Sequence, residues 1–232
     1  MQREDAMAAA GGSEDFVERQ IASRGVRDPL VLAAMRAVPR EVFVPAAQRH
    51  RAYQDRPLPI GEDQTISQPY IVAFMIEALG LKGGEKVLEV GAGSGYAAAV
   101  LSKIAGTVFA IERIAALAEL AKANLAGAGC SNVTVRHADG TQGWPEEAPF
   151  DAILVSAGAP EVPPSLMHQL ALGGRLVIPV GKDPGAQHLL CVTRTAADAW
   201  RRTDIADVRF VPLIGKEAWD DDGKRHIDYT AP

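Results

Sequence analysis

The stretch VLEVGAGSGY, Val87–Tyr96, decides the fold that this sequence predicts. Its three alternating glycines, Gly91, Gly93 and Gly95, separate an apolar run typical of a buried strand from a run with helical periodicity. Glycine at a strand-to-helix turn lets the backbone turn tightly and lets a ligand approach without meeting a Cβ atom. The plainer alternative is a tight turn without a ligand, but three alternating glycines exceed what packing requires. We therefore expect a ligand-binding turn here.

Strand and helix patterns alternate on either side of this turn. Continuous apolar runs are typical of strands buried on both faces, and helices between such strands predict parallel pairing with right-handed connections. We therefore expect an α/β fold with a doubly wound, mostly parallel Rossmann-like sheet and helices on both faces. The expected strands are 86–90, 107–112, 133–137, 150–156 and 174–180, the expected helices are 96–105, 114–129 and 165–172, and two amphipathic runs, 188–195 and 203–213, predict antiparallel C-terminal edge strands.

A helical extension is expected before the first strand. Residues 14–25 form one amphipathic segment, and Asp28, as N-cap, starts a second helix over 29–38. The stretch 39–64 is rich in proline and polar residues and predicts a long irregular segment, of a kind that often contributes to a site.

The same pattern predicts a single domain. Its expected bounds are 14–219, with an N-terminal helical part over 14–80 and a Rossmann-like core with edge strands over 81–219. Residues 1–13, which carry early acidic residues and a short Ala run, and residues 220–232, which mix both charge signs with few apolar groups, are predicted to be flexible tails.

Composition excludes several classes of function. A chain of 232 residues that is 47% hydrophobic can bury a full core, and its net charge of -5 argues against broad binding to nucleic acid or to anionic membranes. No apolar run reaches the roughly 18 residues of a membrane span, and the N-terminus lacks the pattern of a secretory signal. With only Cys130 and Cys191, we expect no disulfide framework, no closed zinc site and a reducing, cytoplasmic setting.

The acid in front of the glycine loop separates two kinds of ligand. Dinucleotide folds carry GxGxxG, with a helix N-terminus aimed at a pyrophosphate, whereas this loop reads GxGxG and follows Glu89. S-adenosylmethionine (AdoMet) has no phosphate but carries an ammonium and a sulfonium, which a nearby carboxylate attracts. Glu89 therefore favours AdoMet over a nicotinamide dinucleotide.

Two further acids end or follow the next strands. Glu112 ends the second strand, where a carboxylate can accept hydrogen bonds from both ribose hydroxyls, and the alternative is a solvated charge. Asp139 follows the third strand, where its carboxylate or the neighbouring amide of Gly140 can address the adenine amino edge. The alternative for Asp139 is an Asx-turn before Gly140. Carboxyl ends of parallel strands face one crevice, so the joint placement favours a ligand site.

The segment QTISQPYI, Gln64–Ile71, precedes an apolar helical run. Pro69 suits the first helical position, which makes Gln68 the N-cap and leaves Ser67 one residue outside the helix. The alternative is that Ser67 itself caps the helix, since helix starts vary by a residue or two. We interpret this segment as a lip that faces the substrate.

With these motifs together, the sequence resembles the protein-L-isoaspartate O-methyltransferases, which are class I AdoMet-dependent enzymes. The resemblance spans residues 14–219 and implies methyl transfer to the free α-carboxylate of L-isoaspartyl residues in damaged proteins and peptides. It also implies S-adenosyl-L-homocysteine (AdoHcy) as product, no metal, and repair through a succinimide; we further expect a monomer. The motifs are DQTISQPYIVAFM, VLEVGAGSGYAAAVL, DGTQGWPEEAPFDAILVSAGAPEVP, GGRLVIPVG and VRFVPL, of which TISQPYIVA is the most specific.

The resemblance also implies roles for individual residues. Ser67 occupies the active-site position. Thr141 departs from the family, in which an aromatic residue often follows the DG pair, and Ile214 and Ala218 stand where some relatives have polar residues. The implied cofactor residues are Thr65, Ile66, Glu89, Gly91, Ala92, Gly93, Gly95, Glu112, Asp139 and Gly140, and the implied substrate residues are Thr65, Ser67, Val211, Pro212 and Leu213.

The chemistry requires little from acid or base groups. A carboxylate with an ordinary pKa of roughly 4 is already ionised at neutral pH, so no general base is expected. What the reaction needs is alignment of one oxygen with the methyl group and exclusion of water. Ser67 can donate a hydrogen bond to the other oxygen. The remaining alternatives are a dehydrogenase, a methyltransferase for another substrate, and a non-catalytic module that binds isoaspartyl sites.

Overall fold

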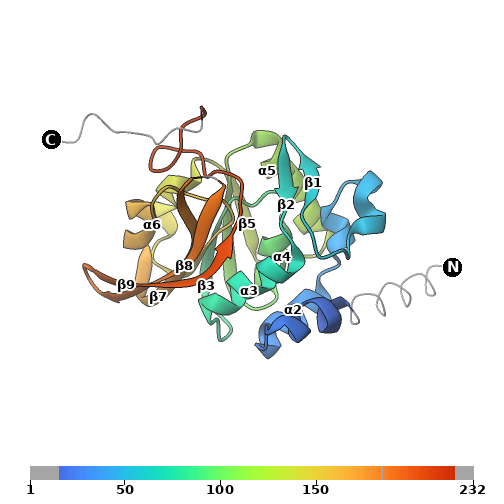
Figure 1. Ribbon diagram of the computed structural model, residues 1–232, viewed down its shortest axis with the longest axis horizontal. Coiled ribbons are helices and arrows are strands. Elements are labelled where there is room, and N and C mark those ends of the chain that lie inside the picture. The colour runs from blue at the N-terminus through green and yellow to red at the C-terminus, as the bar shows by residue number, and fades with distance from the viewer. Residues whose placement is uncertain (1–15, 184, 223–232) are drawn as a thin grey trace.

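A seven-stranded, mostly parallel sheet forms the centre of the protein (Figure 1). The structure is a computed structural model and describes residues 16–183 and 185–222. The strand order is β5-β4-β3-β6-β7-β8-β9; the first five of these pair in parallel, and β8 and β9 are antiparallel, so the expected fold class is confirmed. The strands are β3 (Lys86–Val90), β4 (Thr107–Glu112), β5 (Val133–His137), β6 (Phe150–Val155), β7 (Leu170–Asp183), β8 (Ala186–Ala196) and β9 (Ala199–Val208).

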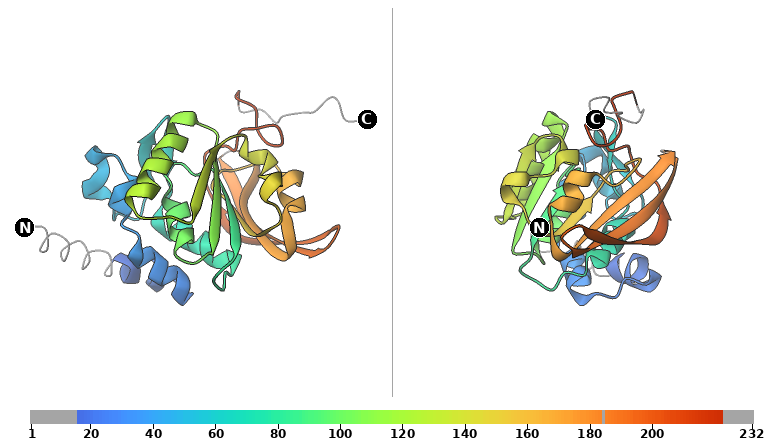
Figure 2. Two further views of the ribbon diagram at one scale, coloured as in Figure 1. Left: turned by 180° about the vertical axis from the view of Figure 1, so that it is seen from behind. Right: turned by 90° about the vertical axis from the view of Figure 1, so that its left-hand side faces the viewer.

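Both faces of this sheet are covered (Figure 2). Successive strand residues point to opposite faces, so within β4 Val108 and Ala110 join one apolar cluster and Phe109 and Ile111 join the other. The first cluster also holds α2 (Pro29–Ala37), α3 (Pro69–Leu79), α4 (Tyr96–Ser102) and α5 (Ala115–Gly127), and the second holds α6 (Pro164–His168). Burial on both faces explains why the strands read as continuous apolar runs.

Several predicted boundaries in the C-terminal half were wrong: β7 begins at Leu170 rather than at 174, and β9 begins at Ala199 rather than at 203. Helix α6 ends at His168 rather than at 172, because the backbone of Gln169 accepts a hydrogen bond from Phe150 N at 2.8 Å and enters the sheet. Strand β9 ends at Val208 rather than at 213. There the backbone N–H of Phe210 donates to the side chain of Gln187 at 2.8 Å, and the chain leaves the ladder.

The N-terminal extension is helical, as expected. Residues 16–20 are helical and lead through the 3-10 turn η1 (Ala22–Arg24) to Gly25, whose φ is 108°. Asp28 caps α2, since its carboxylate accepts hydrogen bonds from Leu30 N and Val31 N at 2.8 and 3.3 Å.

The stretch 39–64 is more regular than its composition predicts. It contains the 3-10 helices η2 (Arg40–Phe43) and η3 (Ala46–Arg51), and β1 (Leu58–Gly61) pairs with β2 (Gln64–Ile66) as an antiparallel hairpin. The hairpin turn places Glu62 and Asp63 at φ 51° and 54°. Such turns usually carry Asn-Gly or Asp-Gly, so Glu-Asp hid the hairpin from sequence analysis.

The two ends of the chain are not among the residues that the structure describes. The predicted tail 1–13 and residues 223–232 of the predicted tail 220–232 lie outside the described residues, so the domain bounds of 14–219 remain a prediction. None of the described helices is long and apolar enough to cross a membrane.

Candidate active site

Three neighbouring cavities lie at the carboxyl ends of β3 and β6, where the strand order reverses. Ligands bind at such a switch point in open parallel sheets. The outer cavity, of about 710 Å³, is lined by residues including Pro57, Ser67, Arg209 and Val211. The strand-end cavity, of about 100 Å³, lies beside Glu112 and Gly140, and the glycine-loop cavity, of about 40 Å³, lies beside Glu89 and Ser94. Thr65 and Ser156 line all three, so the cavities meet at these two residues.

The glycine loop adopts a backbone that only glycine takes without strain. Gly91, Gly93 and Gly95 have φ values of 86°, 54° and 89°. A Cβ atom on Gly93 would lie 3.3 Å from Cδ1 of Ile60, which belongs to the β1–β2 hairpin. The hairpin therefore packs directly against the loop.

Glu89 presents an acid without a full set of partners. It is buried, and its Oε1 accepts a hydrogen bond from Ser156 Oγ at 3.4 Å. Among the described residues, nothing pairs with Glu89 Oε2 or with the nearby Ser94 Oγ. Burial raises the pKa of Glu89 to about 8, although the Ser156 hydrogen bond acts in the opposite direction. Buried polar atoms are normally satisfied, so these two fit a ligand with an ammonium group.

Glu112 is held by the backbone on both sides. Its Oε2 accepts from Gly93 N at 2.8 Å, and its Oε1 accepts from Ile114 N at 2.9 Å. The side chain lies on the strand-end cavity and is buried. Each carboxylate oxygen can accept more than one hydrogen bond, so both keep capacity for a ligand with paired hydroxyls.

Asp139 and Gly140 have different places: the Asp139 side chain binds backbone groups, and Gly140 lines the strand-end cavity. The carboxylate of Asp139 accepts from Thr141 N at 2.9 Å and from Lys216 N at 2.9 Å, and it does not line the strand-end cavity. Gly140 does line it, and a Cβ atom there would lie 2.5 Å from Val90 Cγ1. The Asx-type cap is therefore present, and an adenine contact by Asp139 remains a prediction.

The lip before α3 lies where the cavities meet. Pro69 starts the helix and Gln68 is its N-cap, so Ser67 stands outside the helix as expected. The first free amide, Tyr70 N, is capped by Asp55 Oδ1 at 3.0 Å, which leaves the Ser67 hydroxyl unneeded for capping. Ser67 lines both the outer and the glycine-loop cavities.

Thr65 and Ile66 lie on strand β2, directly before Ser67. The exposed Thr65 lines all three cavities, and the buried Ile66 lines the glycine-loop cavity. Ala92 also lines that cavity, together with Gly91 and Gly93. The structure therefore brings these predicted residues to one place, whereas Gly95 lies outside the three linings and is the N-cap residue of α4.

Residues 211–219 form the C-terminal strap, whose first four residues, 211–214, line the strand-end cavity. Figure 1 shows the β1–β2 hairpin and the segment after β9 on the same, upper side of the sheet. Gly158 anchors the strap, because its N–H donates to Val211 O and its carbonyl accepts from Leu213 N, both at 2.8 Å. Val211 lines the outer cavity as well, whereas Pro212 and Leu213 line only the strand-end cavity.

The three residues that depart from the family pattern all lie in the C-terminal strap or against it. Thr141 is buried, and its hydroxyl donates to Asp139 and accepts from Glu217 N at 3.2 Å. Ile214 lines the strand-end cavity, and Ala218 packs in the second apolar cluster. These residues thus hold the strap against the sheet.

Sequence analysis missed Ser156. It follows β6 and lines all three cavities, and its backbone N–H donates to Val90 O at 2.8 Å. The rule that placed Glu112 and Asp139, that residues after parallel strands face one crevice, would have found Ser156 if applied to the fourth strand. The outer cavity also gains Asp207, Arg209 and other residues from the end of β9 and beyond.

The side chains fit AdoMet in two independent places. The glycine-loop cavity offers an acid with one unpartnered oxygen, Glu89 Oε2, and the strand-end cavity offers a carboxylate beside apolar walls. Within residues 16–183 and 185–222, no group of three or more His, Cys, Asp or Glu side chains has the arrangement of metal ligands.

Comparison with known proteins identifies the family of this architecture. Residues 12–218 match the family model "Protein-L-isoaspartate(D-aspartate) O-methyltransferase (PCMT)". Protein-L-isoaspartate O-methyltransferase 1 of Rhodopseudomonas palustris is 63% identical over 216 residues, which is 93% of this chain and 88% of that protein.

Two solved structures are similar over most of the chain. A protein-L-isoaspartate O-methyltransferase superposes with a TM-score of 0.77 at 31% identity, covering 85% of this chain and 64% of that chain, which is less than two thirds of it. A putative protein-L-isoaspartate O-methyltransferase of Plasmodium falciparum, in complex with AdoHcy, gives a TM-score of 0.76 at 28% identity and covers 87% and 98% of the two chains.

Proposed function

The chain belongs to the protein-L-isoaspartate O-methyltransferase family and is an AdoMet-dependent protein carboxyl methyltransferase, and from this premise we propose how its residues divide the reaction. It methylates the free α-carboxylate of L-isoaspartyl residues in damaged proteins and peptides. The resulting ester lets a neighbouring backbone nitrogen close a succinimide, whose hydrolysis returns some normal linkage. We assign roles to the residues from one observation, namely that the three cavities meet at Thr65 and Ser156.

In this proposal the cofactor is held by the strand-end cavity and the glycine-loop cavity, together called the inner cavities. AdoMet, when bound, supplies an electrophilic methyl group. Glu89 pairs with its ammonium, Glu112 accepts from its ribose hydroxyls, and the apolar walls around Leu117 and Ile214 enclose the adenine. The glycine loop permits this approach because Gly91 and Gly93 carry no Cβ atom.

The substrate occupies the outer cavity. Ser67 donates a hydrogen bond to one carboxylate oxygen and leaves the other free to face the methyl group. A neutral hydroxyl suits this role, because a stronger donor would weaken the nucleophile. None of the described histidines lines the three cavities, and no proton needs to be removed from an ionised carboxylate.

Ser67→Ala is expected to lower kcat/KM for an isoaspartyl peptide about 10- to 100-fold, because a hydrogen bond to a charged group contributes about 1.5–3 kcal/mol. The Kd for AdoHcy should stay unchanged. Ser102→Ala is the control, since the Ser102 hydroxyl donates to Ala99 O within α4 and lies outside the three cavities. Full activity of Ser67→Ala would remove Ser67 from the mechanism.

The function itself is tested with labelled AdoMet and two peptides that differ only in an isoaspartyl or aspartyl linkage. We expect label to enter the isoaspartyl peptide and not its aspartyl twin. Equal labelling would indicate a different carboxylate substrate. Binding of the isoaspartyl peptide without labelling would indicate a non-catalytic binding module.

We also propose that the enzyme acts as a cytoplasmic monomer without nucleic-acid or membrane partners. The net charge of -5 supports the absence of nucleic-acid and membrane partners, because binding to a polyanionic surface needs an excess of positive charge on the protein. Cys130 and Cys191 are both free, as expected in a reducing compartment.

A further inference from the structure

Arg40 is a buried cation to which the reaction described above assigns no role. It belongs to η2 and is fully buried. Its guanidinium donates to main-chain carbonyls on the loop 52–56 and on the lip. Nη1 donates to Ala52 O and, at 3.5 Å, to Gln54 O, while Nη2 donates to Arg56 O at 3.2 Å and to Ser67 O at 3.1 Å. Burying a charge is unfavourable, so its presence here requires a reason.

The two carbonyls bound by Nη2 belong to two different segments that contribute residues to the outer cavity. Arg56 directly precedes Pro57, which lines this cavity, and Ser67 lines it from the lip. One nitrogen atom therefore joins two segments that line the substrate space. A guanidinium is planar and rigid, so it defines the spacing of the groups that it bridges.

A second set of contacts ties the same two segments together. Asp55 Oδ1 accepts from Tyr70 N at 3.0 Å, and Asp55 Oδ2 accepts from Gln68 Nε2 at 2.6 Å. The loop and the lip are thus joined at Ser67 and again just after it, at Gln68 and Tyr70. Of these connections, the Arg40 bond is the one made to Ser67 itself.

We propose that Arg40 is a positioning residue that sets the separation between the Pro57 wall and the lip, and so directs the Ser67 hydroxyl toward the methyl-transfer point. The proposal rests on the methyltransferase function proposed above. Lysine cannot replace Arg40 here, because its single ammonium cannot bridge the four carbonyls in the geometry of a planar fork.

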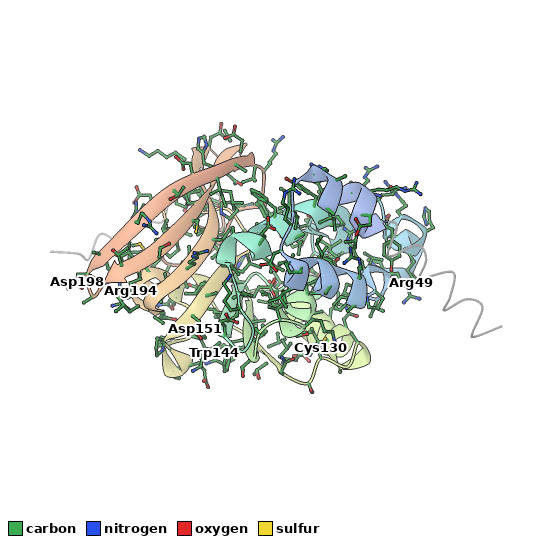
Figure 3. The ribbon with its side chains drawn as sticks, turned by 90° about the horizontal axis from the view of Figure 1, so that it is seen from below. Arg49, Cys130, Trp144, Asp151, Arg194 and Asp198 are labelled. Carbon is green, nitrogen blue, oxygen red and sulfur yellow. The ribbon has the colours of Figure 1, made fainter. Side chains whose placement is uncertain are left out.

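The test compares Arg40→Lys with Arg194→Lys. Arg194 is a matched control, because its guanidinium also donates to four main-chain carbonyls, those of His168, Leu170, Ala196 and Ala197. Figure 3 shows Arg194 on the β-strand side of the molecule, opposite Arg49 of the N-terminal extension. Both variants remove carbonyl contacts, but only Arg40→Lys does so at the outer cavity.

Arg40→Lys is expected to lower kcat/KM for an isoaspartyl peptide about tenfold or more, because a misplacement near 1 Å is enough for such a loss. Its Kd for AdoHcy should stay within about twofold of wild type, since the inner cavities keep their residues. Amide hydrogen exchange should rise together in residues 52–57 and 63–70. Arg194→Lys should leave kinetics and exchange in both segments unchanged.

Several results would overturn the proposal. These are an unchanged kcat/KM for Arg40→Lys, an equal loss of AdoHcy binding, an equal kinetic loss in Arg194→Lys, or unaltered exchange in the two segments. If Arg40→Lys does not fold, Pro57→Gly loosens the same wall with Arg40 intact, and an unchanged peptide KM would then reject the idea. Wild-type activity in the same assay tests the function separately, and the exchange measurement does not depend on activity.

Discussion

Glu89→Gln is expected to raise the Kd for AdoMet by about 10²- to 10³-fold, because removing one partner of a buried charge pair costs roughly 3–4 kcal/mol. The substitution keeps the shape of the side chain but leaves the ammonium of the cofactor without a counter-charge. Glu119→Gln is the control, since Glu119 lies on the exposed side of α5 with 72% of its side chain exposed. Isothermal titration with AdoMet measures both variants.

The same substitution has a pH signature. Without cofactor, burial holds the pKa of Glu89 at about 8, against an ordinary value of 4.5. Between these values the folded state keeps a proton that the unfolded state has lost, so the stability contributed by this group falls as pH rises toward 8. Glu89→Gln cannot lose that proton. It should therefore match the wild type near pH 5 and exceed it near pH 8 by about 1–3 kcal/mol in unfolding free energy.

Cofactor affinity should follow the opposite trend in the wild type. Binding the ammonium requires ionised Glu89, so the Kd should fall by up to about tenfold per pH unit between pH 6 and 7.5. The slope should vanish in Glu89→Gln. Thermal denaturation without ligand and titration with ligand, each at several pH values, measure both effects. A wild-type Kd that does not change with pH, together with an unchanged Kd in the variant, would remove Glu89 from cofactor binding.

Glu112→Gln is expected to weaken AdoHcy binding by about 10²-fold, because a mismatched buried hydrogen bond costs about 1–3 kcal/mol and a ribose contact is lost as well. Both oxygens of Glu112 accept backbone N–H groups, from Gly93 and Ile114. The amide of glutamine must therefore turn its NH₂ toward one of these donors. The change disturbs the glycine loop and the ribose contact together.

Adenosine distinguishes the two acids. It contains the ribose but lacks the amino-acid end of the cofactor, so competition by adenosine should weaken in Glu112→Gln and stay unchanged in Glu89→Gln. Equal effects of the two substitutions on adenosine would contradict the division of the cofactor between the two inner cavities. Full retention of AdoHcy affinity in Glu112→Gln would reject the ribose contact itself.

Local patterns were enough to predict much of this protein. The parallel sheet follows from apolar runs whose residues are buried on both faces, and the start of α2 follows from a cap made within three residues of Asp28. The turn at Gly91 and Gly93 follows from an amino acid without Cβ. These features depend on interactions between near neighbours, which the order of residues states directly.

Other features escaped because they lack a local signal. The β1–β2 hairpin turns on Glu62 and Asp63, and its glycine, Gly61, stands before this pair, so no Asn-Gly or Asp-Gly motif marks the turn. The end of α6 depends on pairing of Gln169 with Phe150 in the neighbouring strand. In both cases, pairing with another strand in the folded protein overrides the propensity of the segment.

The sequence by itself thus determined the α/β fold and the glycine turn. It also determined that Glu89 precedes this turn, that Glu112 ends the next strand and that Ser67 lies on the lip before α3. Only the tertiary structure decided that Thr65 and Ser156 line the same three cavities, that Asp139 bonds to Lys216, and that Arg40 reaches Ser67. The last two contacts join residues 77 and 27 positions apart. The physical reason is that periodicity and capping act within a few residues, whereas these contacts exist only after distant segments have packed on the sheet.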